Sequence, residues 1–170
     1  MIIRVGGLAD VPAVLAMFDG AVAWLTARGR TGQWGSEPFS TNPVRVEKAT
    51  AWAASGGMRI AEIDGRPAGC LVVGPAMEYV SPAAEPELYV QVLINDRRFH
   101  GRGVGAALLE RAVTEAAELG VSLVRVDCYA GDDGRLVRYY ESQGFTRTET
   151  FTVGEWPGQI LERRLPVATG

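Results

Sequence analysis

The sequence has one histidine and two cysteines, and this shortage excludes several kinds of active site. His100 alone cannot form a zinc site with several histidine ligands, and it leaves little from which to build a histidine-dependent hydrolase. Cys70 and Cys128 lie far apart in apolar segments without a Cys-x-x-Cys pair, a pattern typical of buried, reduced thiols. We therefore expect neither a metal site nor a redox centre.

Long apolar runs and surplus positive charge are also lacking. No run approaches the ~20 residues that cross a bilayer, and Met1 to Val5 lead into a glycine-containing turn rather than a signal peptide. The formal net charge of −3 argues against a nucleic-acid-binding surface and is easier to reconcile with a cationic small molecule. We expect a cytoplasmic protein with neither a membrane nor a nucleic acid as its partner.

What is present is enough apolar sequence for a core. The chain has 170 residues, of which 47% are hydrophobic and 22% charged, and this balance is typical of a globular protein. A chain of this length can bury a core without disulfides or metals. We expect one domain over residues 1–170.

Apolar residues recur at helical or strand spacing along the chain and predict a mixed α/β fold. The predicted helices cover 9–28, 43–54, 104–119 and 136–142, and the predicted strands cover 1–5, 58–63, 68–73, 87–94, 121–128, 145–153 and 159–165. Asp64-Gly65 predicts a hairpin, and Trp156-Pro157-Gly158 predicts a turn between the last two strands. Residues 87–128 form a strand–helix–strand unit, which predicts a parallel strand pair.

The strongest chemical signal is the segment Arg98-Phe99-His100-Gly101-Arg102-Gly103-Val104-Gly105, between a predicted strand and a predicted helix. Glycines let the backbone approach a ligand closely, and the unpaired N–H groups of a first helical turn point at any anion bound there. Glycines present only for packing would not need the flanking charges of Arg98 and Arg102. The segment therefore indicates a phosphate site.

Two other phosphate-binding motifs fit less well. A nucleotide P-loop needs Gly-Lys-Ser or Gly-Lys-Thr at the helix start, and Gly105-Ala106-Ala107 has neither the lysine nor the hydroxyl. Gly101-x-Gly103-x-x-Ala106 with Asp127 fits the permissive dinucleotide fingerprint, which leaves an oxidoreductase as an alternative. That fold needs further strand–helix units after the acidic residue, and the segment after Asp127 predicts one short helix and two antiparallel strands.

The glycine segment resembles the signature of the GCN5-related N-acetyltransferase (GNAT) family: Gln or Arg, two residues, Gly, one residue, then Gly or Ala. Arg98 to Gly103 match it in full, and the resemblance extends through Leu108-Leu109 to Tyr140-x-x-x-Gly144-Phe145. His100 and Asp133 replace residues that are commonly arginine and asparagine, and a common proline before the turn is missing. The resemblance implies a single mixed, mostly antiparallel sheet with helices on both faces and a central parallel pair splayed at the coenzyme site.

The same resemblance implies the reaction and the residues that serve it. The expected activity is direct transfer of an acetyl group from acetyl-CoA to a primary amine. Tyr140 is the implied acid for the leaving thiolate, and Glu87 is the candidate base for the amine. The implied coenzyme contacts are Val92, Leu93 and Ile94 on the central strand, Arg98, Phe99, His100, Gly101, Arg102, Gly103, Val104, Gly105 and Ala106 in the turn and helix, and Asp133 and Tyr140 beyond them.

The acceptor is harder to infer. The polar loop 29–43 contains Gln33, Trp34 and Phe39, which we take as candidate acceptor contacts, although aromatic residues in loops equally serve as packing anchors. The acidic balance favours a small cationic amine. A non-catalytic acyl-CoA sensor or interaction module stays open as an alternative, and the resemblance leaves room for a homodimer.

Overall fold

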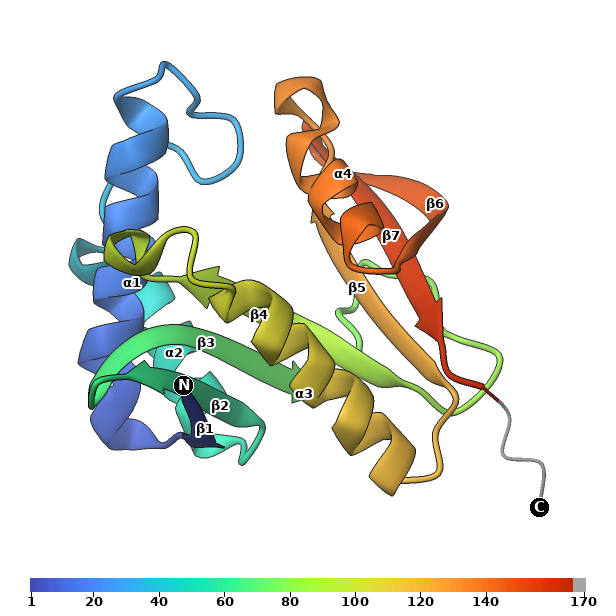
Figure 1. Cartoon of the computed structure of the whole chain (residues 1–170). Helices are drawn as coiled ribbons and strands as arrows, with labels where there is room; N and C mark the ends of the chain where they lie inside the picture. Colours follow the sequence, from blue (N-terminus) through green and yellow to red (C-terminus); the bar gives the residue numbers. More distant parts are fainter. Residues whose placement is uncertain (167–170) are drawn as a thin grey trace. The chain divides into compact units, whose positions relative to one another are not determined.

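The computed structural model describes residues 1–166 and contains the elements that the periodicity predicts (Figure 1). The α-helices are α1 (Val11–Thr26), α2 (Pro43–Ala54), α3 (Val104–Glu118) and α4 (Arg135–Ser142), and the short 3-10 helices are η1 (Leu8–Asp10), η2 (Phe39–Thr41), η3 (Arg97–Phe99) and η4 (Asp132–Gly134). The strands are β1 (Ile2–Val5), β2 (Met58–Ile63), β3 (Arg66–Gly74), β4 (Leu88–Asn95), β5 (Leu123–Tyr129), β6 (Thr146–Val153) and β7 (Trp156–Arg164).

Hydrogen-bonded neighbours give a seven-stranded sheet in the order β1-β2-β3-β4-β5-β7-β6. The pair β4–β5 is parallel, with Leu88 opposite Val124 and Val90 opposite Val126. The other registers, β1–β2, β2–β3, β5–β7 and β6–β7, are antiparallel. The expected mixed sheet with one parallel pair and flanking helices is confirmed.

The chain forms two compact units. The first comprises Met1–Val72 and Val92–Leu108, and the second comprises Val73–Gln91 with the described residues from Leu109 onward. The boundary crosses β3, β4 and α3, so each of these elements contributes to both units.

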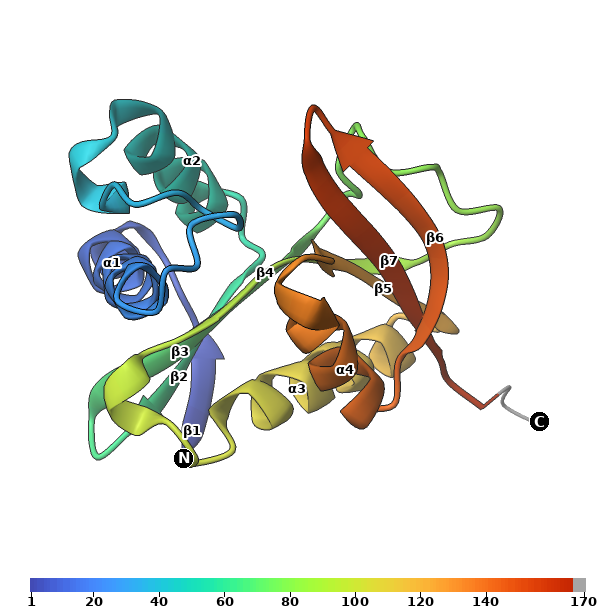
Figure 2. The ribbon, with the colours of Figure 1, turned by 90° about the horizontal axis from the view of Figure 1, so that it is seen from above.

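In the first unit, α1 and α2 lie side by side and pack against each other and against strand residues (Figure 2). Their apolar residues form one core with β2 and β3, which includes Phe18, Met58 and Ile60. The Asp64-Gly65 turn joins β2 to β3 with φ of 51° and 73°, the two positive values that a tight type I′ hairpin requires. The predicted hairpin is confirmed.

One expectation about apolar runs needs correction. Leu8–Thr26, which comprises η1 and α1, is a helical stretch of 19 residues with a mean hydropathy of 1.5, and by length and composition alone it could cross a membrane. Asp19 and Gly20 separate its two apolar segments, so the sequence shows no single unbroken run. Seven α1 residues are buried in the core, and a core helix of this kind passes the same test of length and composition.

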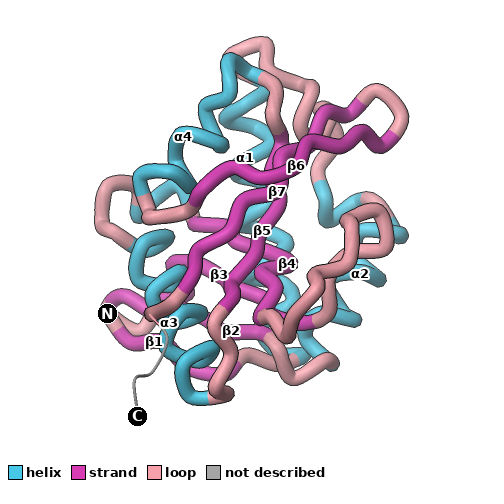
Figure 3. Tube along the Cα trace, turned by 90° about the vertical axis from the view of Figure 1, so that its right-hand side faces the viewer, coloured by secondary structure: helices cyan, strands magenta, loops and turns pink. Residues whose placement is uncertain are grey.

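In the second unit, β5, β7 and β6 run next to one another (Figure 3), and α4 packs on β5 and β6. The predicted turn at Trp156-Pro157-Gly158 is wrong, because these residues begin β7. The chain instead reverses at Gly154-Glu155, where Gly154 has a φ of 60° and Val153 lies opposite Trp156. Pro157 lies opposite Thr152 of β6, and its carbonyl accepts a hydrogen bond from Ala130 N at 2.9 Å, just beyond the last β5–β7 pair.

Candidate functional site

The glycine-rich turn connects β4 to α3 within the first unit. The Asp96 side chain accepts a hydrogen bond from Arg98 N at 2.9 Å and thereby starts η3. Three further backbone bonds fold the turn back on itself, the last from Arg102 N to Phe99 O at 3.2 Å. The side chain of Arg97 stacks on Trp24 of α1, with the guanidinium carbon 3.9 Å from the ring centre. The turn is therefore anchored at both its backbone and its side chains.

Glycine is required at two positions of this turn for backbone conformation. Gly101 and Gly103 have φ of 79° and 72°, in the left-handed region that other residues rarely adopt, and a Cβ at either would meet nothing within 4 Å. The first α-helical bond runs from Ala107 N to Gly103 O at 3.1 Å. The N–H groups of Val104, Gly105 and Ala106 therefore point out of the helix end, where an anion can accept them.

The start of α3 lies unusually close to β3. A Cβ on Gly69 would lie 2.5 Å from Val104 Cγ1 and 3.0 Å from Leu108 Cδ1. Asp96 N donates to Ala68 O at 2.8 Å, which ties the end of β4 to the same stretch of β3. The absence of a side chain at Gly69 thus fixes where the helix N-terminus lies.

Charge around the turn is distributed unevenly. Arg98 donates through its guanidinium to Asp96, at 2.7 Å for the closest pair, and this arginine lowers the pKa of the Asp96 carboxyl. The side chains of His100 and Arg102 are exposed, and Arg102 forms no ion pair with any residue between 1 and 166. Phe99 is half-buried. Arg102 is thus available to an anion, whereas the charge of Arg98 is already compensated.

The loop between α1 and α2 is held down by an aromatic cluster. Phe39 is buried and stacks on Phe18, with ring centres 4.4 Å apart and planes 4° from parallel. Trp34 meets Phe18 edge-on at 5.4 Å. Asp19 accepts from both Ser40 N and Ser40 Oγ. The burial of Phe39 favours packing over contact with a ligand.

Beside this cluster the same loop forms a hollow of about 210 Å³. It is lined by Trp34, Gly35, Ser36, Glu37, Asn42 and Arg45. Arg45 lies over the Phe39 ring at 3.8 Å and donates to Trp34 O at 3.3 Å, while burial lowers its pKa. Of the predicted acceptor residues, Trp34 lines the hollow and Gln33 directly precedes it in the sequence. Both side chains are half-buried.

Tyr140 lies in the second unit, on α4. Its side chain is buried, with the ring edge-on to Tyr139 at 5.4 Å and to Phe145 at 5.8 Å. Burial raises the pKa of the Tyr140 phenol well above its usual value, and the nearby Cys128, Tyr139 and Asp127 add to the effect. The phenol is therefore protonated at any ordinary working pH, which is the state an acid needs.

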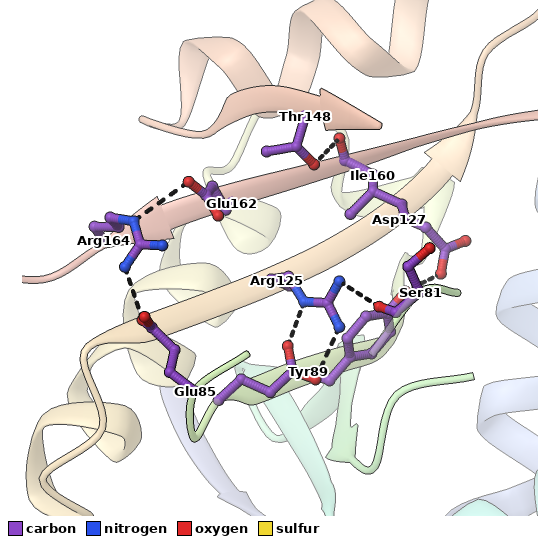
Figure 4. Close-up of polar contacts among 10 residues, drawn as sticks. Ser81, Glu85, Tyr89, Arg125, Asp127, Thr148, Ile160, Glu162 and Arg164 are labelled. Atoms are coloured by element: carbon purple, nitrogen blue, oxygen red, sulfur yellow. Dashed lines mark hydrogen bonds and ion pairs between the residues drawn. The ribbon is translucent and has the colours of Figure 1, made fainter. Parts of the chain in front are cut away.

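Glu87, the predicted base, is bound by an arginine. Arg125 is buried and donates to the Glu87 carboxylate through both Nε and Nη2, the latter at 3.0 Å. Arg125 also donates through Nη1 to Ser81 O at 3.0 Å (Figure 4). The charge of Glu87 is thus neutralised by a partner within the same unit, and the carboxylate must leave Arg125 before it can take a proton.

Asp127 was not predicted from the sequence as a residue of the transferase site. The phenol of Tyr89 donates a short hydrogen bond to Asp127 Oδ2, and burial raises the pKa of this carboxyl (Figure 4). The signal was present in the alternation Arg125-x-Asp127-x-Tyr129, which places polar and aromatic residues on one face of an otherwise apolar strand.

The remaining predicted residues divide between the two units. Val92, Leu93 and Ile94 run straight into the glycine turn in the first unit, and Val104, Gly105 and Ala106 begin its helix. Asp133 belongs to the second unit with Glu87 and Tyr140, and its φ of 61° lies in the left-handed region, which aspartate and asparagine adopt more readily than most residues. The first unit thus holds the turn together with the loop, and the second holds the ionisable candidates.

Comparison with known proteins gives a family and a fold. The model of the acetyltransferase (GNAT) family matches residues 21–145. Mycothiol acetyltransferase from Propionibacterium freudenreichii subsp. shermanii is 33% identical over 137 residues, which are 78% of this chain and 36% of that protein. The chain therefore spans about a third of the length of this curated relative.

Solved structures resemble the chain over nearly its whole length. A GNAT-family acetyltransferase from Listeria monocytogenes has a TM-score of 0.73 at 20% identity and covers 96% of this chain and 94% of its own. PaiA N-acetyltransferase from Thermoplasma acidophilum, solved in complex with coenzyme A, has a TM-score of 0.70 at 16% identity, covering 96% and 98%. At these identities the likeness concerns the fold, and it agrees with the mixed sheet described above.

Proposed function

The chain belongs to the GNAT acetyltransferase family, and on that premise we propose that it transfers an acetyl group from acetyl-CoA to the primary amine of a small cationic acceptor. The observation that carries the proposal is the turn at the start of α3. Two glycines at positive φ present the N–H groups of Val104, Gly105 and Ala106 without side chains in the way. Such a helix terminus suits a pyrophosphate.

The residues present fit the coenzyme in kind. The backbone donors at the helix start and the exposed side chains of His100 and Arg102 would hold the pyrophosphate, with Arg98 and Phe99 shaping the turn. The backbone of Val92 to Ile94 would bind the pantetheine arm where β4 and β5 are expected to diverge. Bound in this way, the coenzyme supplies an activated acetyl thioester. Proteins solved with coenzyme A, such as PaiA N-acetyltransferase, support this choice of ligand.

We assign Tyr140 as the acid. Its buried phenol keeps its proton until a stronger base is present, so Oη can deliver it to the departing sulfur. Asp133 has a left-handed backbone in η4, directly before Gly134, the N-cap residue of α4. Glu87 is the weaker assignment, because its pairing with Arg125 must break before it can accept a proton from the amine.

For the acceptor we propose a small molecule, bound in the cytoplasm, with Gln33 and Trp34 as contacts from the loop beside the hollow. Phe39 supports them by holding the loop on α1. The net charge of −3 supports a cation over an anion. Association into a homodimer stays a prediction.

The test is turnover. Purified protein is mixed with acetyl-CoA and a panel of primary amines, neutral alcohols and amino acids, and both free thiol and acetylated product are measured. We expect an N-acetylated amine in equal amount to the thiol released. Acetylation of acidic or neutral acceptors alone would refute a cationic acceptor, and binding of acetyl-CoA without any product would favour a sensor.

A further inference from the structure

A carboxylate of the second unit lies among aromatic rings, on one face of β5. Residues directly opposite or two apart share a face, so Asp127 and Tyr129 lie on the same side as Ile160 and Gly158 of β7. Ile160 packs with Tyr89 and Val80 in a small apolar cluster, and Phe151 covers it. We refer to Asp127 with Tyr79, Tyr89, Tyr129, Phe151 and Trp156 as the Asp127 cluster.

The carboxylate has no cation of its own. Asp127 accepts a hydrogen bond from the neutral phenol of Tyr89. The charge of Arg125 lowers the pKa of Asp127, but the guanidinium donates its hydrogen bonds to Glu87 and Ser81 O. Among residues 1–166 no lysine or arginine forms an ion pair with Asp127. A half-buried carboxylate without a countercharge is costly, and a bound cation would remove that cost.

The rings form an arc of successive contacts that begins at Tyr129, two residues after Asp127 on β5, and runs to Tyr79. Tyr129 lies 5.4 Å from Trp156, Trp156 lies 6.2 Å from Phe151, and Phe151 stacks on Tyr79 at 5.3 Å. Burial and then the charge of Asp127 raise the pKa of Tyr79 to about 12. Aromatic faces attract ammonium groups, most strongly where water is excluded.

Two glycines make room for this arc. A Cβ on Gly158 would lie 2.2 Å from the Phe151 ring, and a Cβ on Gly131 would lie 2.2 Å from the Tyr129 hydroxyl. Both rings therefore lie directly against the backbone. The cluster is also reachable, since Tyr79 is 47% exposed and Asp127, Tyr129 and Trp156 are half-buried.

We propose that the Asp127 cluster is the binding site for the ammonium group of the acceptor, with the carboxylate as countercharge and the aromatic arc around it. This inference rests on the proposed function and names the part of the second unit that would recognise the amine. Asp127 forms no ion pair within the described part of the chain, so its carboxylate can bind an ammonium group. The Glu87 carboxylate is already paired with Arg125.

The experiment measures binding of benzylammonium and of neutral benzyl alcohol by NMR titration, in wild type and in Asp127→Asn. We expect wild type to prefer the cation, and Asp127→Asn to lose about tenfold or more of that affinity. Glu118→Gln, which removes an exposed carboxylate of α3, is the matched control and should bind as wild type does.

Acetyl-CoA is titrated into the same proteins to separate the two claims. Equal affinity of Asp127→Asn and wild type for benzylammonium, while acetyl-CoA binds, overturns the ammonium site alone. Failure of wild type to bind acetyl-CoA overturns the proposed function, and with it the acceptor role of the cluster.

Discussion

The glycine turn of the first unit and the Asp127 cluster of the second are built in opposite ways. The turn uses exposed backbone, and a Cβ on Gly101 or Gly103 would touch nothing. The cluster uses side chains from separate segments, packed so closely that Gly131 and Gly158 have no room for a Cβ. The two proposals above use this difference: backbone donors of the first unit would hold the coenzyme, and side chains of the second unit would bind the amine and supply the proton.

The largest expected effect comes from replacing Tyr140, the proposed acid of the second unit. Tyr140→Phe removes the proposed acid and keeps the ring that packs on Phe145. We expect kcat to fall about 100-fold, while the dissociation constant for acetyl-CoA changes little, because general acids contribute on this scale. Steady-state kinetics and calorimetry measure the two quantities. Tyr139→Phe is the matched control, and equal losses in both variants would remove Tyr140 from the chemistry.

The next largest effect comes from Gly69, which lies against the start of α3 in the first unit. Gly69→Ala places a methyl group 2.5 Å from Val104 Cγ1, so the start of α3 must shift. We expect the free energy of unfolding to fall by about 2 kcal/mol and acetyl-CoA to bind more weakly, since overpacking costs this much. Gly20→Ala, in the interior of α1 with nothing within 4 Å, should instead stabilise by about 0.5–1 kcal/mol. Unchanged coenzyme affinity in Gly69→Ala would separate the helix position from binding.

The smallest effect comes from two carboxylates whose pKa values shift in opposite directions. Arg98 lowers the pKa of Asp96, so the stability it contributes is present above the unfolded pKa and is lost as pH falls through the folded one. Burial raises the pKa of Asp127, against opposing contributions from Tyr89 and Arg125, so its stability contribution is lost as pH rises. Relative to wild type, Asp96→Asn should be less stable at and above about pH 4, and this deficit should shrink as pH falls below about 4. Asp127→Asn should gain stability over wild type as pH rises above about 4.

Urea unfolding at several pH values measures both slopes. Asp96→Ala should cost up to about 1 kcal/mol at neutral pH, because it also removes the hydrogen bond to Arg98 N that an asparagine can keep. If the stability difference from wild type changed with pH in the same direction in Asp96→Asn and Asp127→Asn, the opposite pKa shifts of the two carboxyls would be refuted.

The two regions also differ in how far the sequence could predict them. The turn is contiguous, so its glycines, its flanking charges and the helix that follows all lie in one short segment. The Asp64-Gly65 hairpin and the parallel β4–β5 pair were predictable for the same reason, since local turn chemistry and chain order determine them.

The Asp127 cluster could not be predicted in this way, because the β5–β7 register and the course of the 74–86 segment bring its members together. The misplaced turn at Trp156 to Gly158 hid the fact that Trp156 and Gly158 belong to that strand face. The pairing of Glu87 with Arg125 likewise depends on neighbouring strands, not on sequence spacing. Motifs that act through backbone can be found in a sequence, whereas sites assembled across a sheet need its register.

The central claim is that the turn at the start of α3 holds acetyl-CoA, and calorimetric titration of wild type and Gly103→Glu tests it most directly. The substitution forces a side chain into a backbone with φ of 72° and brings a carboxylate to the phosphates. Gly154→Glu, at a φ of 60° in the β6–β7 turn, controls for strain and charge. The account predicts saturable binding by wild type and Gly154→Glu that weakens at least about 100-fold in Gly103→Glu, with no binding of NAD. Equal affinity in all three proteins, or binding of NAD in place of acetyl-CoA, would contradict it.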